Sequence, residues 1–329
     1  MVKLMDAVVL AAGMGKRMAP LSHLCPKPLI PVACKSLIDW VIDSLSKAGV
    51  SRLVVVVGYK GEEVRRHVEA TWSTLDVQCV QAKDYFKGAG YSLLAAEEHV
   101  PGSFILCPAD LITDHEVVIG TVKGMRKLRA PVIATGRSSR GGTAVLAEGD
   151  KCGEVIRIGG GAGGRVCIGV VALDSSFFTY LKRSLARGEG SVVSALRLYV
   201  DEGNTLGFVD FPGKVWFDVD TLPDVLDANR YILNAGLAKG GIYVPPGEVS
   251  RSMERNIRGS LLVGPVLVGL ENQVESSMLG PNVSLSGGVK CKRAVVSNAV
   301  VFGGGEVTGV AKDVAVFGGV QFPARCVGH

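Results

Sequence analysis

The sequence lacks the segments that would place a protein in or across a membrane. It has no apolar run of about 18 or more residues free of charge, the length that a membrane-spanning helix needs, although 47% of its residues are apolar. The residues from Met1 to Asp6 lead directly into an apolar run, so no export signal is indicated. We therefore expect a cytoplasmic protein with no membrane partner.

Paired cysteines and clusters of basic and aromatic residues are also lacking. None of the eight cysteines belongs to a Cys-x-x-Cys pair, and most lie in apolar contexts, so we interpret them as reduced and structural. The net charge of +5 is modest, and no group of Lys and Arg is interleaved with aromatic residues. Nucleic acid is therefore not an expected partner.

Alternating strand and helix patterns are present in the first part of the chain. The 329 residues suffice for about two domains with a large core. Predicted strands cover 7–12, 53–57, 77–80 and 104–107, and predicted helices cover 36–48, 62–71 and 91–99. This β-α-β order predicts a sheet covered on both faces, with ligands at the carboxyl ends of its strands.

The pattern loosens after residue 131 into strands and a helical pair before residue 200. These strands are predicted at 131–135, 144–147, 154–158 and 166–173, and a helix at 222–233 closes the domain. We expect a Rossmann-like, doubly wound mixed α/β sheet in a domain of residues 1–235. Gly240-Gly241 and Pro245-Pro246 indicate a linker at 236–250.

The last third of the chain has a repeat of six residues. Valine recurs at 283, 289, 295, 301 and 307, after an earlier phase at Leu262, Val268 and Val274. This spacing predicts a parallel β-helix of hexapeptide repeats at 251–329. The alternative is a Gly- and Val-rich sandwich or meander, because Gly303 to Gly305 interrupt the repeat. Since such a coil has open ends and apolar flanks, we expect a homo-oligomer that forms through it.

The loop after the first strand has the features of a phosphate-binding segment. Gly13 and Gly15 allow a tight turn that presents N–H groups to an anion, and Lys16, Arg17 and Lys27 supply positive charge. The loop is not a Walker A motif, since no hydroxyl residue follows its Gly-Lys, and Met18 replaces the third glycine of a dinucleotide fingerprint. The alternative is an ordinary glycine turn with solvated lysines.

Four segments in order resemble the sugar-1-phosphate nucleotidyltransferase family. Leu-Ala-Ala-Gly-x-Gly-x-Arg followed by Pro-Lys-Pro-Leu-x-Pro is similar to the family signature, and the other segments lie at 88–94, 104–110 and 216–221. The last of these, with Ala228-Asn-Arg, looks closest to archaeal CTP:inositol-1-phosphate cytidylyltransferases. The resemblance implies an enzyme of the EC 2.7.7 type with the nucleotidyltransferase type A fold, often followed by a left-handed β-helix.

The resemblance also implies roles for individual residues. The backbone from Leu10 through Ala11, Ala12, Gly13 and Met14 to Gly15 would hold the phosphates of a nucleoside triphosphate (NTP), and Gly88 and Gly90 would lie against the base. Arg17 and Lys27 would be the catalytic cations, and Asp110 with Asp218 or Asp220 would hold Mg²⁺, which prefers oxygen ligands. The alternative for the three aspartates is helix capping.

The segment expected to bind the acceptor, a sugar- or polyol-1-phosphate, departs from the family pattern. The usual acceptor lysine is missing, which leaves Arg157 or Arg165, and Cys167 and Ile168 precede Gly169 where an Asn or Asp is usual. We expect Arg157 and Gly169 to bind the acceptor. Two other interpretations stay open: a hexose-1-phosphate thymidylyl-, uridylyl- or guanylyltransferase, and a non-catalytic regulatory paralogue that binds a nucleotide sugar.

Overall fold

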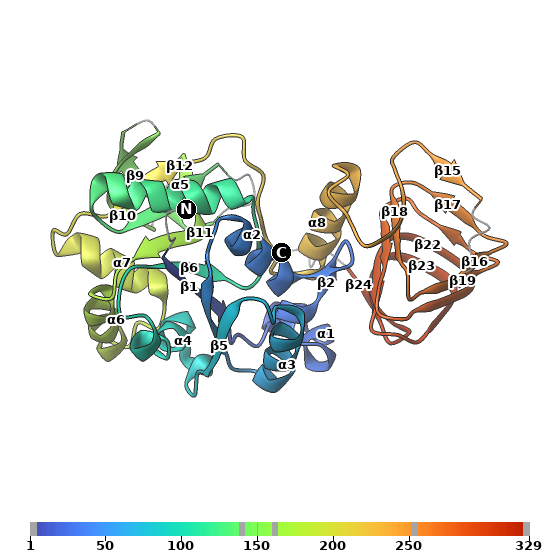
Figure 1. Cartoon of the computed structure of the whole chain (residues 1–329), viewed down its shortest axis with the longest axis horizontal. Helices are drawn as coiled ribbons and strands as arrows, with labels where there is room; N and C mark the ends of the chain where they lie inside the picture. Colours follow the sequence, from blue (N-terminus) through green and yellow to red (C-terminus); the bar gives the residue numbers. More distant parts are fainter. Residues whose placement is uncertain (1–4, 138–141, 150, 160–163, 252–255, 325–329) are drawn as a thin grey trace. The chain divides into compact units, whose positions relative to one another are not determined.

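The computed structural model describes residues 5–137, 142–149, 151–159, 164–251 and 256–324. The chain divides into two compact units, which we describe separately (Figure 1). The first unit comprises Met1–Met14 and Ile38–Asp218, and the second comprises Gly15–Leu37 and Val219–His329. Among the described residues, no helix combines the length and the apolar character that crossing a membrane requires.

The first unit is built on a mixed sheet of nine strands. Their order is β5-β4-β1-β6-β11-β8-β12-β10-β9. Strands β5, β4, β1 and β6 are parallel, whereas β11 runs antiparallel to β6 and β8, so the predicted mixed α/β sheet is confirmed. The bounds are β1 Asp6–Ala11, β4 Arg52–Val57, β5 Asp76–Gln81, β6 Phe104–Pro108, β8 Val132–Gly136, β9 Ala144–Glu148, β10 Cys152–Ile158, β11 Arg165–Leu173 and β12 Gly207–Asp210.

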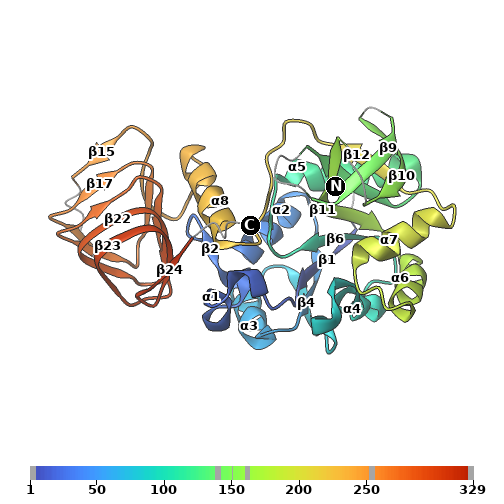
Figure 2. The ribbon, with the colours of Figure 1, turned by 180° about the vertical axis from the view of Figure 1, so that it is seen from behind.

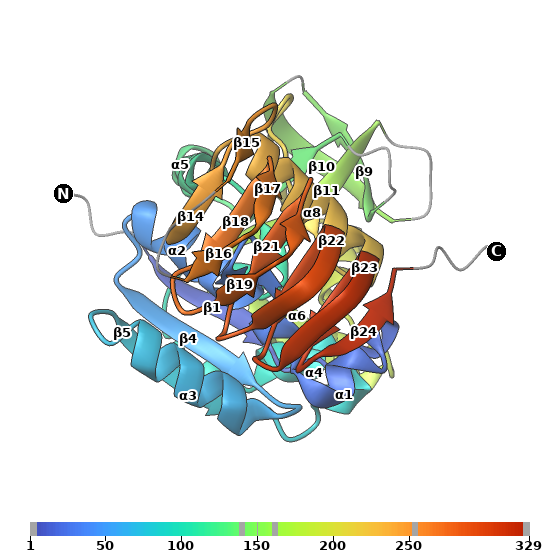
Figure 3. The same ribbon diagram turned by 90° about the vertical axis from the view of Figure 1, so that its right-hand side faces the viewer.

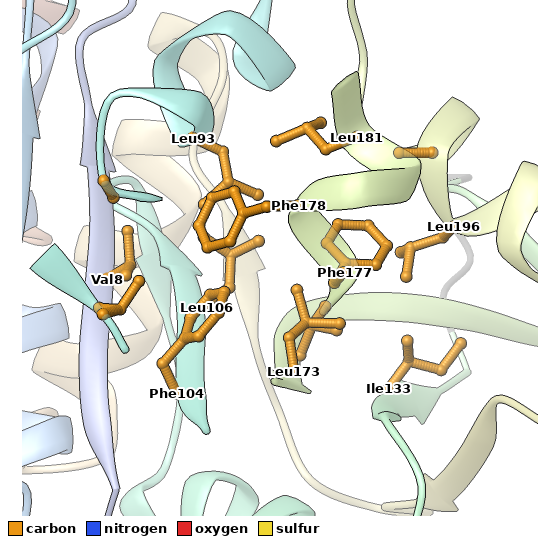
Figure 4. Packing of buried hydrophobic residues seen from close by; sticks show 14 of the residues in the cluster. Val8, Leu93, Phe104, Leu106, Ile133, Leu173, Phe177, Phe178, Leu181 and Leu196 are labelled. Atoms are coloured by element: carbon orange, nitrogen blue, oxygen red, sulfur yellow. The ribbon is translucent and has the colours of Figure 1, made fainter. Parts of the chain in front are cut away.

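Helices cover both faces of this sheet because its strands are apolar on both faces. The helices are α2 Leu37–Lys47, α3 Gly61–Thr71, α4 Ala89–Leu94, α5 His115–Leu128, α6 Phe177–Ala186 and α7 Val192–Asp201. Leu93, Leu181 and Leu196 from α4, α6 and α7 join one buried cluster with Phe104 and Leu106 of β6 (Figure 4). Helices α6 and α7 lie side by side (Figure 2).

Helix α5 packs on the opposite face and was not predicted. A Cβ on its Gly124 would lie 2.4 Å from Val209 Cγ2, so only glycine allows the helix to come this close to β12. Gly120 and Gly124 lower the helix propensity of this segment, which hides it from a pattern search. Its N-cap is Asp114, whose side chain accepts a hydrogen bond from Glu116 N at 3.0 Å.

The second unit joins the loop after β1 to the C-terminal part of the chain. Its helices are α1 Leu21–Leu24 and α8 Leu222–Asn234, with 3-10 turns η1 Lys16–Met18 and η2 Lys27–Leu29. Its strands are β2 Pro31–Val32, β3 Lys35–Ser36, β14 Gly241–Val244, β15 Val249–Ser250, β16 Ile257–Arg258, β17 Leu261–Val263, β18 Val266–Gly269, β19 Gln273–Glu275, β20 Met278–Leu279, β21 Val283–Leu285, β22 Lys290–Phe302, β23 Glu306–Phe317 and β24 Val320–Pro323. Helix α8 packs against β2 and against β21, β22 and β23.

Parallel pairings of constant spacing organise the C-terminal strands. Ile257 pairs with Val274 and Val274 with Cys291, so partners in neighbouring strands are 17 residues apart (Figure 3). Leu261 pairs with Met278 and Met278 with Val295 at the same spacing. This strand-rich region is compatible with the predicted β-helix.

The buried side chains follow the predicted six-residue repeat with one exception. Of the eight residues in the repeat, Val295 is 47% exposed, and its neighbour Val296 is buried instead. Three repeats of six would give 18 residues for a coil of three sides, but the observed register is 17. The repeat therefore slips by one residue at this strand, and Val295 points outward.

Candidate functional site

In the first unit, the backbone after β1 is anchored and open on one side. Leu10 O accepts a hydrogen bond from Ala109 N, and Ala12 O accepts one from Tyr59 N, both at 3.0 Å. Gly13 is exposed, and a Cβ placed on it would meet none of the described atoms within 4 Å. The turn is therefore fixed by its carbonyl groups while the backbone at Gly13 faces open space.

In the second unit, Gly15 has a conformation and a position that require glycine. Its φ is +62°, which is in the left-handed region, and a Cβ there would lie 3.0 Å from Lys27 Cβ and 3.3 Å from Ser22 Cβ. Met18 N donates to Gly15 O at 2.9 Å, which closes the turn η1. Gly15 thus lets the stem of Lys27 pack directly against the loop.

The two predicted catalytic cations share one carboxylate in this unit. Lys27 Nζ lies 2.8 Å and an Arg17 guanidinium nitrogen 2.6 Å from Asp220 Oδ1. The Lys27 side chain is 10% exposed, whereas that of Arg17 is 68% exposed. Asp220 is held in turn because its N–H donates to Asp224 Oδ2 at 3.2 Å. Lys27 is the fixed cation of the pair and Arg17 the mobile one, because exposure leaves a long side chain free to move.

Two of the predicted metal ligands lie together in the first unit. Asp110 precedes the short strand β7 Leu111–Ile112, and Asp218 ends β13 Phe217–Asp218, which pairs antiparallel with β7. A carboxylate oxygen of Asp110 and one of Asp218 lie within 4.8 Å of each other. Ligands of one Mg²⁺ stand about 3 to 4 Å apart, so a small side-chain rotation brings both onto a single ion.

An ion-pair cluster closes the β7–β13 pair and was missed from the sequence. Lys214 Nζ lies 2.9 Å from Asp114 Oδ2 and also contacts Glu116 Oε2. Asp114 follows β7 and Lys214 precedes β13, so their contact ties together the segments that carry Asp110 and Asp218. Only the N-cap position of Asp114 was a usable signal in the sequence.

This cluster makes stability depend on pH in a defined window. Desolvation alone would raise the pKa of Asp114, but the Glu116 N–H and Lys214 outweigh it and hold that pKa below its ordinary value of 3.8. Hydrogen bonds first from Glu116 and then from Asp114 raise the pKa of Lys214 above 10.5. The stabilisation from Asp114 is thus present above pH 3.8 and lost as pH falls through its lowered pKa.

We expect Lys214→Met to destabilise the protein at pH 7 by at most about 1 kcal/mol, because the cluster is partly exposed. Thermal unfolding of both proteins as a function of pH measures this. The difference in midpoint should disappear under acidic conditions, where Asp114 is protonated, and above the raised pKa of Lys214. A difference that is constant over the whole pH range would show that lost packing, not the ion pairs, is responsible.

The predicted base-binding glycines pack against another part of the first unit. Gly88 has φ +137°, and a Cβ on it would lie 2.4 Å from Gly190 O. Gly90 N donates to the same oxygen at 2.8 Å. Close backbone packing therefore suffices to explain why both positions are glycine, and their predicted contact with a base stays a prediction.

The candidate acceptor residues lie in different strands of the first unit. Gly169 has φ +108° beside Pro108 of β6, at an irregularity in β11 between Cys167 and Val171. Arg157 is exposed on β10, near the edge of the sheet. Arg165, the other candidate, is engaged within the fold: its guanidinium lies over the Phe208 ring at 4.8 Å.

Comparison with known families gives a match over the first half of the chain. Residues 7–173 match the model of the MobA-like NTP transferase domain. This range includes β1, the loop that follows it, and β6 with Asp110.

Named relatives match over a longer part. The bifunctional protein GlmU of Methanococcus aeolicus is 27% identical over 238 residues, covering 70% of this chain and 54% of that protein. The bifunctional IPC transferase and DIPP synthase of Archaeoglobus fulgidus is 30% identical over 264 residues, covering 78% of this chain and 49% of that protein. The chain spans about half the length of these relatives.

Solved structures share the fold. The inositol-1-phosphate CTP transferase from T. maritima superposes with a TM-score of 0.59 at 23% identity, over 68% of this chain and 91% of that one. At this identity the likeness concerns the fold alone, and it supports a nucleotidyltransferase α/β fold.

Proposed function

Because the chain belongs to the MobA-like NTP transferase domain family, we propose that it transfers a nucleotidyl group from an NTP to a sugar- or polyol-1-phosphate. The observation that carries this proposal is the pair of carboxylates of Asp110 and Asp218, within 4.8 Å of each other. Two acidic side chains at this distance suit a divalent cation bound to phosphate oxygens.

The reaction needs charge neutralisation more than proton transfer. An oxygen of the 1-phosphate attacks the α-phosphorus, a new P–O bond forms, and the bond to the leaving pyrophosphate breaks. The attacking group is already an anion at pH 7, so it requires no general base. The protein must instead reduce the repulsion between two anions and stabilise the charge on the pyrophosphate.

We assign the residues to these tasks. Asp110 and Asp218 would hold Mg²⁺, with Asp220 as the third candidate ligand; when bound, the ion would neutralise phosphate charge. The backbone from Leu10 to Gly15 would bind the NTP phosphates. Lys27 would bridge the α-phosphate and the incoming phosphate, and Arg17 would move from Asp220 to the departing pyrophosphate.

For the substrates we propose CTP and inositol-1-phosphate. The printed name of the structural neighbour from T. maritima, an inositol-1-phosphate CTP transferase, and the sequence resemblance of 216–221 support this choice. Arg157, which is exposed, and Gly169 would bind the acceptor.

The test is to incubate the protein with Mg²⁺, each of five NTPs and a panel of 1-phosphates, and to measure pyrophosphate. We expect the fastest release with CTP and inositol-1-phosphate. Faster release with another pair would replace these substrates, for example by a hexose-1-phosphate with UTP. No release with any pair would contradict transferase activity and favour a regulatory protein that binds a nucleotide sugar.

For the C-terminal strands we propose a left-handed β-helix that forms a homo-oligomer. The hexapeptide spacing supports the coil. One of its sides carries an exposed apolar ladder, in which Met278 pairs with Val295 and Val295 with Val310. These side chains are 41%, 47% and 69% exposed, and a second copy of the chain would cover them.

We expect Val295→Lys to reduce the oligomer to a monomer, because a charge in the middle of the ladder would be buried without a partner. Light scattering after size exclusion measures the mass. Lys312→Ala, on the same strand pair but outside the ladder, is the matched control and should keep the oligomer. An unchanged mass for Val295→Lys would exclude this ladder as the interface.

A further inference from the structure

A tight turn in the second unit is held in a conformation that its own residues disfavour. Strands β2 and β3 are joined by Ala33 and Cys34, with φ of +49° and +62°. Residues other than glycine seldom adopt such values in succession, and they persist only where the surroundings enforce them. Ala33 is 1% exposed, so its surroundings are protein.

The residue that holds this turn is Asn229 of α8. Its Oδ1 accepts hydrogen bonds from Ala33 N at 3.0 Å and from Ser284 Oγ at 2.8 Å. Its Nδ2 donates to Asn282 O at 3.3 Å. Asn229 is only 1% exposed, so it joins three segments that are distant in sequence: the β2–β3 turn, helix α8 and strand β21.

The connection from this turn to Lys27 is short and stiff. Pro26, Pro28 and Pro31 fix the backbone φ angle at three positions around Lys27. Ile30 O accepts from Leu37 N at 3.0 Å, and Ile30 N donates to Lys27 O at 3.1 Å. A displacement of the turn is therefore transmitted to Lys27 instead of being absorbed by a flexible segment.

Helix α8 also fixes the other end of the Lys27 side chain. Asp220, which accepts from Lys27 Nζ, lies just before the helix. Thr221 and Asp224 form a capping box at its N-terminus. The same helix thus holds the ammonium group of Lys27 through Asp220 and the backbone that carries Lys27 through Asn229.

We infer that Asn229 is a positioning residue for Lys27, and that α8 with the C-terminal strands is the rigid support of the phosphate-binding lysine. This inference rests on the proposed function for its kinetic consequence, but its structural content concerns Lys27 alone. It assigns to the C-terminal part a task in the site to which it contributes no reacting group.

The first experiment measures the reactivity of Lys27 without any substrate. Acetylation with an N-hydroxysuccinimide ester, followed by mass spectrometry of peptides, gives a rate for each lysine. Lys27 should react slowly in the unaltered protein, because it is 8% exposed and paired with Asp220. Asn229→Leu removes both polar ends of the hub, and we expect acetylation of Lys27 to be at least about tenfold faster, with Lys47 as the unchanged internal reference.

Two control variants separate positioning from general destabilisation. Ser284→Ala removes a buried donor to the same Oδ1 but leaves the bond to Ala33. Asn234→Ala removes a contact between α8 and Asn282 on the exposed side. Both should leave the acetylation rate of Lys27 within about twofold of the original, since neither touches the β2–β3 turn. If Asn229→Leu does not fold, Asn229→Ala, which adds no bulk, takes its place.

The second experiment is kinetic and uses the substrates found for the unaltered protein. A lysine displaced by about 1 Å should lower kcat by about tenfold or more, with little change in KM for the NTP. An unchanged acetylation rate of Lys27 in the Asn229 variant, or an equal increase in Ser284→Ala, would overturn the inference. If no substrate pair is active, the proposed function fails while the acetylation result still decides the role of Asn229.

Discussion

Replacing Asp110 by Asn is expected to lower turnover by about 10³-fold or more while the protein stays folded. Asp110 lies at the end of β6 with its carboxylate close to that of Asp218. A neutral amide keeps the shape of the side chain but cannot supply the negative charge that a metal-bound phosphate site needs. The measurement is the rate of pyrophosphate release at saturating substrates, together with the thermal unfolding midpoint.

The matched control is Asp76→Asn, the same chemical change at a side chain that is 72% exposed at the start of β5. It should leave turnover unchanged. Mg²⁺ titration adds a second readout, because loss of a ligand raises the metal concentration needed for half-maximal rate. Turnover of Asp110→Asn within about tenfold of the original would exclude this carboxylate from the metal site.

Replacing Lys27 by Ala is expected to lower kcat by about 10²-fold or more, the scale for the loss of one electrostatic stabiliser. The ammonium group is held at 2.8 Å from Asp220 Oδ1, so its position is prepared before phosphate arrives. Arg17→Ala should have an effect of similar size. Steady-state kinetics with the NTP and the acceptor varied in turn separate kcat from KM.

Lys16→Ala is the control for Lys27, because Lys16 is a cation of the same loop but is exposed. We expect it to alter KM modestly and to leave kcat within about threefold. If Lys27→Ala changes only KM for the NTP, the lysine binds the nucleotide without bridging the two reacting phosphates.

Local patterns predicted most of the first unit and the family. The family resemblance is confirmed, and the predicted strands at 53–57 and 166–173 match β4 and β11 closely. Helix α5 escaped because its glycines serve close packing against β12, which is a tertiary requirement. Val295 was placed inside because a strict period of six cannot show a register of 17.

Contacts between distant segments set the limits of prediction at the site. Gly15 was expected to be a turn glycine, and its positive φ agrees with this. The partnership of Lys27 with Asp220 joins residues 193 positions apart, and no sequence period encodes it. Asn229 was noted only as part of Ala228-Asn-Arg, without a role. The predicted domain boundaries at 235 and 250 remain predictions.

Asp220 has a consequence for which anions the loop selects. Its carboxylate already neutralises part of the charge of both Lys27 and Arg17, so an incoming ligand competes with an anion that belongs to the protein. A ligand with a single negative charge gains little by the exchange, whereas a triphosphate with several charges gains much more. Asp220 thus acts as a resident counter-ion that sets a minimum charge for binding, and we expect singly charged phosphodiesters to bind this loop weakly.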